Sequence, residues 1–217
     1  MREHTEYRLA WGLGAAALLG FVILVWSCTR LPTVEHAGRY ESAILRDEYL
    51  SAIRVRALCQ SGVVAWGSGV AVSSRHALTA RHVVACEGST PQAIVAEVFG
   101  GLSKPMLIDE VGHADVARLI ADGVGEPFPV WRPPATYLPR YGQEVCAIAG
   151  DSGETRGLLR CGAVALVWGG RLMVGMRVVP GNSGAPVYDA QGAIVGLVTG
   201  GRWTEGREQW ADVLGAE

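Results

Sequence analysis

Ser183 lies in a short segment, residues 180–186, whose sequence PGNSGAP suits neither a helix nor a strand. Glycine adopts backbone angles that other residues avoid, and each proline fixes φ and removes a hydrogen-bond donor. Strongly apolar runs at 172–179 and 193–198 flank the segment, so two buried strands would hold it rigidly. A tight turn that presents one hydroxyl from a stiff scaffold is what a nucleophilic serine needs. The alternative is a plain turn rich in small residues.

A nucleophilic serine needs a general base, because its hydroxyl is almost wholly protonated at neutral pH. Among the five histidines, His82 has the best setting, since it follows the strand-like residues 78–81 and opens a short apolar segment. Asp115 begins another apolar run, and a carboxylate that leads into a buried strand is costly unless it has a partner. We therefore interpret His82 as the base, Asp115 as the group that orients it, and Ser183 as the nucleophile.

Two further residues compete for these roles. Ser152 belongs to a GDSG tetrapeptide, but Glu154 follows it where a small residue is expected. Too few residues separate Ser152 from Asp115 for the strands that should precede the nucleophile. His76 follows a turn-like SSR sequence and lacks the strand-to-helix setting of His82, so we expect it to be a surface residue.

The remaining chain consists of short apolar runs separated by Gly, Pro and Ser, which is typical of strands joined by turns. The expected strands cover residues 53–57, 62–73, 77–80, 92–99, 105–111, 115–121, 143–149, 158–167, 171–179, 185–188 and 193–199. A proline-rich segment, 123–141, connects the two halves. We expect an all-β fold of two packed six-stranded antiparallel barrels, at about 51–122 and 141–201. A short helix at about 205–214 would close the chain, and a single β-sandwich is the alternative fold.

Three segments resemble the motifs of the trypsin-like (chymotrypsin-fold) serine proteases. Residues 67–72 (GSGVAV) with 78–84 (LTARHVV) resemble the family's histidine motif, 113–119 (HADVARL) its aspartate motif, and 180–186 its serine motif. The motifs occur in the family's order, and the resemblance covers roughly residues 53–201. It implies a serine endopeptidase that cleaves protein or peptide substrates through an acyl-enzyme and uses no cofactor. The alternative is a catalytically silent, membrane-anchored domain that binds a peptide or protein.

The resemblance also implies roles for individual residues. His82 would act as general base and then acid, Asp115 would orient it, and Ser183 would be acylated. The backbone N–H groups of Gly181 and Ser183 would form the oxyanion hole. The strand edge that pairs with the substrate backbone in this family corresponds to Thr199, Gly200 and Gly201.

Two positions depart from the pattern of digestive trypsins. Asn182 stands where those enzymes carry an aspartate that pairs with a newly cut N-terminal ammonium. Asparagine cannot form that ion pair, so we expect the active site to form without zymogen cleavage. Arg177 stands where the family places a residue at the base of the specificity pocket, and there it would favour acidic substrate side chains. A solvated arginine at the end of a loop is the alternative.

Four cysteines lie beyond the N-terminal apolar stretch, and their even number favours disulfides in an oxidising compartment. Cys59 with Cys86 would bracket the segment that contains His82, and Cys146 with Cys161 would join two strands of a hairpin. Four buried free thiols in a cytosolic domain are the alternative. The spacing of cysteines and histidines does not suit zinc, so we expect no metal site.

Residues 9–28 carry no charge and, at 1.5 Å per residue, would span about 30 Å as a helix, the thickness of the hydrocarbon core of a bilayer. We expect a single transmembrane anchor after a short tail (1–8), a stalk or linker (29–50), and an extracytoplasmic protease domain from residue 51, either periplasmic or extracellular. A cleaved signal peptide and a lipoprotein signal at Cys28 are the alternatives. The 19 basic and 21 acidic residues nearly balance, so we expect no nucleic-acid partner.

Overall fold

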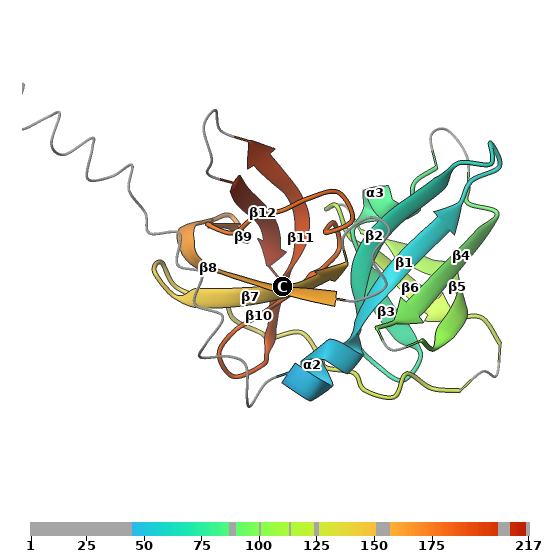
Figure 1. Cartoon of the computed structure of the whole chain (residues 1–217), viewed down its shortest axis with the longest axis horizontal. Coiled ribbons are helices and arrows are strands. Elements are labelled where there is room, and N and C mark those ends of the chain that lie inside the picture. The colour runs from blue at the N-terminus through green and yellow to red at the C-terminus, as the bar shows by residue number, and fades with distance from the viewer. Residues whose placement is uncertain are drawn as a thin grey trace, which may run out of the picture. The chain divides into compact units, whose positions relative to one another are not determined.

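A computed structural model describes residues 45–86, 90–99, 101–112, 114–123, 126–150, 157–203 and 209–215. Twelve strands in these residues form two closed antiparallel barrels of six strands each (Figure 1). The expected all-β architecture of two barrels is therefore confirmed, and the β-sandwich alternative is wrong.

The first barrel closes in the strand order β1-β2-β3-β6-β5-β4. Its strands are β1 (Ala52–Leu58), β2 (Val64–Ala71), β3 (His76–Thr79), β4 (Ala93–Val98), β5 (Ser103–Val111) and β6 (Ala117–Ala121). Side-chain alternation turns one face of β1 into the barrel, where Ile53 and Val55 are buried in the core. Arg54 and Arg56 alternate with them, and their guanidinium groups lie 5.4 and 5.5 Å from the centre of the Trp66 ring.

The second barrel closes in the order β10-β11-β12-β9-β8-β7. Its strands are β7 (Glu144–Gly150), β8 (Gly157–Trp168), β9 (Arg171–Val174), β10 (Pro186–Tyr188), β11 (Ile194–Trp203) and β12 (Gln209–Gly215). The predicted C-terminal helix at 205–214 is wrong, because residues 209–215 form β12, which pairs with both β9 and β11. Ala211 and Val213 alternate into the core, and without this strand the barrel would have two open edges. The second barrel therefore extends to residue 215 and does not end near 201.

A buried apolar cluster joins the two barrels. Its members come from both barrels: Ala52, Val70, Phe99, Ile148, Tyr188, Ile194 and Leu197. Helix α2 (Leu45–Ser51) is attached to this cluster, since the Tyr188 hydroxyl donates to the Glu48 carbonyl at 3.2 Å and lies 3.0 Å from Ser51 Oγ. Burial raises the pKa of the Tyr188 phenol well above its usual range, so the hydroxyl stays protonated and available as a donor.

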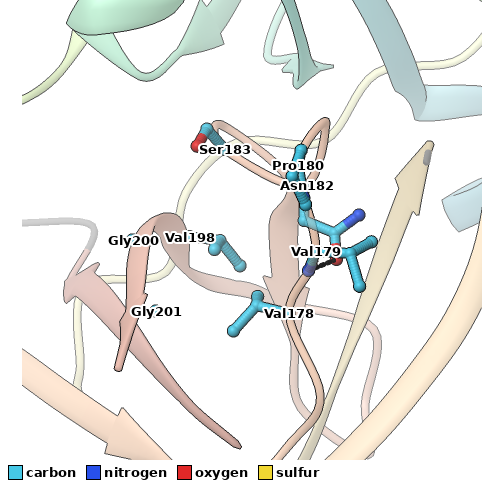
Figure 2. A pocket seen from close by; sticks show the side chains of 8 residues that line it. All are labelled: Val178, Val179, Pro180, Asn182, Ser183, Val198, Gly200 and Gly201. Carbon is cyan, nitrogen blue, oxygen red and sulfur yellow. Dashed lines mark hydrogen bonds between the residues drawn. The ribbon is translucent and has the colours of Figure 1, made fainter. Parts of the chain in front are cut away.

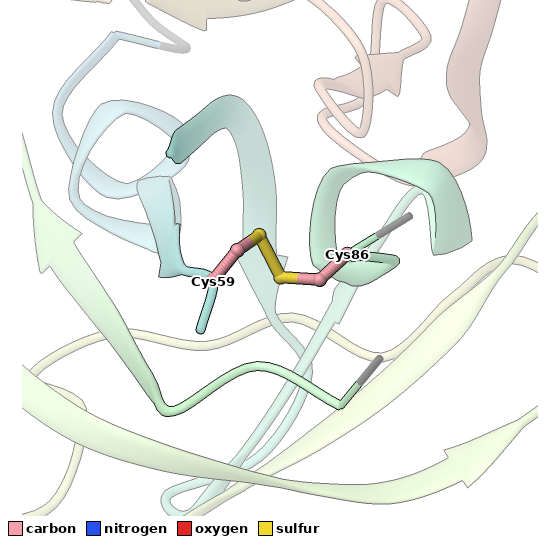
Figure 3. The surroundings of a disulfide bond; sticks show 2 residues. All are labelled: Cys59 and Cys86. Atoms are coloured by element: carbon pink, nitrogen blue, oxygen red, sulfur yellow. A yellow bond between two sulfur atoms is a disulfide. The ribbon is translucent and has the colours of Figure 1, made fainter. Parts of the chain in front are cut away.

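Both expected disulfides are formed. Cys59–Cys86 ties the end of β1 to the residues that follow the short helix α3 (Arg81–Val84), as Figure 3 shows. Cys146–Cys161 joins directly opposed residues of the neighbouring strands β7 and β8. The alternative of four free thiols is therefore wrong.

The expected transmembrane anchor at 9–28 and most of the stalk at 29–50 lie outside the described residues. Within the described residues, neither helix has the length and apolar character needed to cross a bilayer.

Candidate active site

His82 and Asp115 are brought together by the pairing of β3 with β6. Thr79 at the end of β3 lies opposite Ala117 at the start of β6, so the segment after one strand lies beside the segment before the other. Asp115 Oδ2 is 2.6 Å from His82 Nδ1, and Asp115 Oδ1 accepts the backbone N–H of His82 at 3.1 Å. Because a carboxylate can only accept, Nδ1 of the neutral ring carries the proton and Nε2 keeps its lone pair.

The Ser183 turn packs against the end of β3 from which His82 follows. Gly184 has φ +84°, and a Cβ added to it would lie 2.8 Å from the backbone nitrogen of Ala80 and 2.5 Å from Thr79 Oγ1. A side chain at this position would therefore clash with the residues that precede His82. The close approach brings the segments of His82 and Ser183 together from opposite barrels.

Strand β2 forms the bridge between the two barrels at this point. The backbone N–H of Ser68 donates to the Ser183 carbonyl at 2.7 Å, and Ser68 Oγ donates to the Gly181 carbonyl at 2.8 Å. Ser68 Oγ also accepts the backbone N–H of Gly150 at 3.1 Å, at the end of β7. A Cβ on the preceding Gly67 would lie 2.8 Å from the Ser183 carbonyl oxygen, so only glycine allows β2 to approach so closely.

Ser68 is a structurally important residue that sequence reasoning did not single out. It is fully buried and hydroxyl-bearing in a strand of the first barrel, yet its partners belong to the second barrel. One feature of the sequence could have pointed to Ser68, namely that it is a polar residue between two glycines in an otherwise apolar stretch.

Two backbone N–H groups of the turn, those of Gly181 and Ser183, make no hydrogen bond within the described part of the chain. Gly181 has φ +98°, a conformation that favours glycine. Since no described residue accepts from them, these two N–H groups are free to donate to an oxyanion. Ser183 Oγ likewise has no hydrogen-bond partner in the described part of the chain. The hydrogen bond between a nucleophile and its general base is often long when no substrate is bound, so this does not exclude His82 as the base.

The Asn182 side chain binds backbone groups on two different segments. Its side chain is buried, with Oδ1 accepting the N–H of Val179 at 3.0 Å and Nδ2 donating to the Gly150 carbonyl at 3.2 Å. The amide therefore links the segment before the nucleophile to β7.

A cavity of about 180 Å³ opens beside Ser183 (Figure 2). Its lining consists of Val178, Val179, Pro180, Asn182, Ser183, Val198, Gly200 and Gly201. Of the residues expected to bind substrate, Gly200 and Gly201 are thus at the cavity. Thr199 lies between Val198 and Gly200, where the register of β11 against β12 shifts at a bulge. Its hydroxyl donates to the Asp212 carbonyl at 3.3 Å. Arg177 is exposed and is not a lining residue.

Of the two competing residues, the structure describes only His76. Ser152 lies outside the described residues. His76 is the first residue of β3, at the opposite end from α3, and its Nδ1 lies 2.9 Å from Ser73 Oγ. Among the described residues, Glu144 lies near two sulfurs, those of Cys146 and Cys161, but these are bonded to each other and are not available to a metal.

Comparisons with known proteins agree with this fold. A family model described as "Trypsin-like peptidase domain" matches residues 67–197. The structure of the active form of the Rv3671c protease from M. tuberculosis is similar, with 18% sequence identity, coverage of 87% of each chain and a TM-score of 0.69. A serine endoprotease from Yersinia pestis is also similar, with 21% identity, coverage of 86% of this chain and 64% of the other, and a TM-score of 0.67. The comparison with curated proteins found no match.

Proposed function

This chain belongs to the trypsin-like peptidase domain family, and from that premise we propose that it is a serine endopeptidase with Ser183 as its nucleophile. The observation that carries the proposal is the arrangement of His82, hydrogen-bonded to Asp115, beside the glycine-rich turn of Ser183. A fold by itself would not support an activity, because function depends on the site.

Acylation proceeds as follows. Ser183 Oγ attacks the carbonyl carbon of the scissile peptide bond while His82 Nε2 accepts the hydroxyl proton. The N–H groups of Gly181 and Ser183 donate to the negatively charged oxygen of the tetrahedral intermediate. His82 then gives its proton to the leaving amine, the C–N bond breaks, and an ester to Ser183 remains.

Deacylation repeats these roles with water. His82 Nε2 accepts a proton from a water molecule, whose oxygen attacks the ester carbonyl. The second tetrahedral intermediate collapses, the proton returns to Ser183 Oγ, and a free carboxylate product leaves. Throughout, the Asp115 carboxylate stabilises the transient imidazolium and keeps Nδ1 protonated.

The site is ready without cleavage of a precursor. The side chain of Asn182 is neutral and satisfied by Val179 and Gly150, so it needs no new N-terminal ammonium. The edge of β11 at Thr199, Gly200 and Gly201 pairs with the substrate backbone.

We also propose that residues 9–28 anchor the chain and that the protease domain is extracytoplasmic. The two disulfides support that location, since they are rare in the cytosol.

Covalent labelling with a fluorophosphonate tests the nucleophile directly. The full chain in detergent should become labelled in its intact, uncleaved form, the Ser183→Ala variant should not, and the Ser152→Ala variant should label like the wild type. Absence of labelling in a folded wild-type chain would contradict the proposal and favour a domain that only binds peptides or proteins.

A further inference from the structure

The cavity beside Ser183 has an apolar interior. Figure 2 shows Ser183 at one end, with the side chains of Val178 and Val198 between the two segments that enclose the cavity. Val198 is fully buried in the core of the second barrel, and Val178 packs against the same core. Two of the lining side chains therefore also belong to the packed interior of the second barrel.

The polar lining residues offer nothing to a charged ligand. The amide of Asn182 is already bonded to Val179 and Gly150. Ser183 is the proposed nucleophile and faces the reacting carbonyl. Among the described residues, no lining side chain carries a charge.

Arg177 is kept away from the cavity by the alternation of its segment. Met176 and Val178, on either side of it, pack into the barrel core, so the side chain between them is exposed to solvent. The charge that could have selected acidic substrates therefore does not line the cavity, although it is only one residue from Val178.

We propose that this cavity binds an uncharged, apolar side chain of the substrate residue whose carbonyl Ser183 attacks, and that Val178 sets this preference. The inference rests on the proposed function and specifies its substrate class. A carboxylate or ammonium group would lose its hydration in the cavity without gaining a partner, which is strongly unfavourable. An apolar side chain gains by the same burial.

The size of the cavity limits the side chain. Its volume of about 180 Å³ is slightly larger than the roughly 150 Å³ that holds a benzene molecule in an apolar protein cavity. Side chains from valine to phenylalanine therefore fit. Gly200 also lines the cavity, and a Cβ added to it would have no neighbouring atom within 4 Å, so there is open space beside this residue.

A series of peptides that differ only at this residue tests the proposal, with the full chain in detergent. We expect kcat/KM for Leu, Met and Phe to exceed that for Asp, Glu, Lys and Arg by roughly 100-fold. A preference for any charged residue would overturn the inference.

Two adjacent substitutions provide a matched comparison. Val178→Thr keeps the shape but adds a hydroxyl that an apolar substrate would bury without a partner, so kcat/KM for Leu should fall about tenfold. Arg177→Ala should leave the ranking of the peptides unchanged. If Arg177→Ala alters the ranking and Val178→Thr does not, the assignment of Val178 is wrong.

Fluorophosphonate labelling separates this inference from the proposed function. A chain that labels at Ser183 but prefers charged peptides overturns only the substrate class. A folded chain that neither labels nor cleaves overturns both.

Discussion

Both carboxylate oxygens of Asp115 are bonded to His82, one to the ring and the other to the backbone. Oδ2 lies 2.6 Å from Nδ1, and Oδ1 accepts the backbone N–H at 3.1 Å. One side chain therefore fixes the orientation of the ring relative to its own main chain as well as the tautomer. This double attachment makes Asp115 more than a counter-charge, and its loss should affect catalysis more than folding.

Asp115→Asn should lower kcat by about 10⁴-fold with little change in KM. The amide nitrogen would donate to His82 Nδ1, so the ring proton would lie on Nε2, which could then no longer accept the serine proton. Steady-state hydrolysis of a chromogenic ester measures the effect. Asp109→Asn is the matched control, because Asp109 lies 3.9 Å from a different histidine, His76 of β3, and its removal should leave kcat unchanged. A loss below tenfold for Asp115→Asn would contradict the proposed role.

Ser68→Ala should slow acylation about tenfold, because Ser68 holds the backbone of the Ser183 turn. It should also lower the free energy of unfolding by about 1–3 kcal/mol, since the N–H of Gly150 loses its partner. The rate constant of fluorophosphonate labelling reports the first effect and chemical denaturation the second. Ser73→Ala is the control for the labelling rate, because Ser73 is a half-buried serine whose hydroxyl contacts His76 and not the Ser183 turn. Reduced stability with an unchanged labelling rate would show that Ser68 is merely structural.

Asn182→Asp should destabilise the fold by about 2–4 kcal/mol at neutral pH. An ionised carboxylate cannot donate to the Gly150 carbonyl, and the side chain is only 1% exposed. Because a protonated carboxyl can donate, stability relative to the wild type should recover as the pH falls. Unfolding curves between pH 4 and 8 test this, and a difference that stays constant with pH would refute the explanation.

Glu48→Gln should remove a pH-dependent component of stability. Burial raises the pKa of the Glu48 carboxyl above its ordinary value of 4.5, although the Arg132 guanidinium at 3.4 Å opposes the shift. A group whose pKa is raised on folding stabilises the folded state at low pH and loses that contribution as the pH rises through the folded-state pKa. The stability of the wild type relative to Glu48→Gln should therefore decline as the pH rises above about 4.5.

Asp47→Asn is the control for this measurement, because Asp47 is an exposed partner of Arg132 and its removal leaves the buried carboxyl of Glu48 in place. The decline with pH should persist in that variant. If the wild type and Glu48→Gln have the same dependence on pH, burial of the carboxyl has no energetic consequence.

Replacement of Cys59 and Cys86 by serine should lower the free energy of unfolding by about 2–4 kcal/mol. Because this disulfide fastens the residues that follow the His82 helix, labelling of Ser183 should slow at temperatures well below unfolding. The corresponding double variant at Cys146 and Cys161 should lose comparable stability but retain the labelling rate, since that disulfide lies within the β7–β8 pair. Equal slowing in both variants would argue against a local effect on His82.

Local patterns in the sequence were sufficient to predict much of this protein. Side-chain alternation and breaker residues predicted every strand of the two barrels except β12, because the two faces of a strand have different surroundings wherever it lies. The glycines and prolines around Ser183 predicted a tight turn from backbone geometry alone. The pairing of the cysteines also followed from their positions relative to the expected strands.

Other features depended on contacts between distant residues. Residues 209–215 show no strong strand pattern, yet they form β12 because β9 and β11 both need a partner to close the barrel. The role of Ser68 is similarly non-local, since the Gly181 carbonyl it binds lies 113 residues away. Arg177 and Val178 are adjacent in the sequence, so the sequence alone does not show which of them lines the cavity. In the folded chain Arg177 is exposed to solvent and Val178 lines the cavity. Residue types and spacing thus determined the chemistry available to the chain, whereas packing of the two barrels decided which side chains surround it.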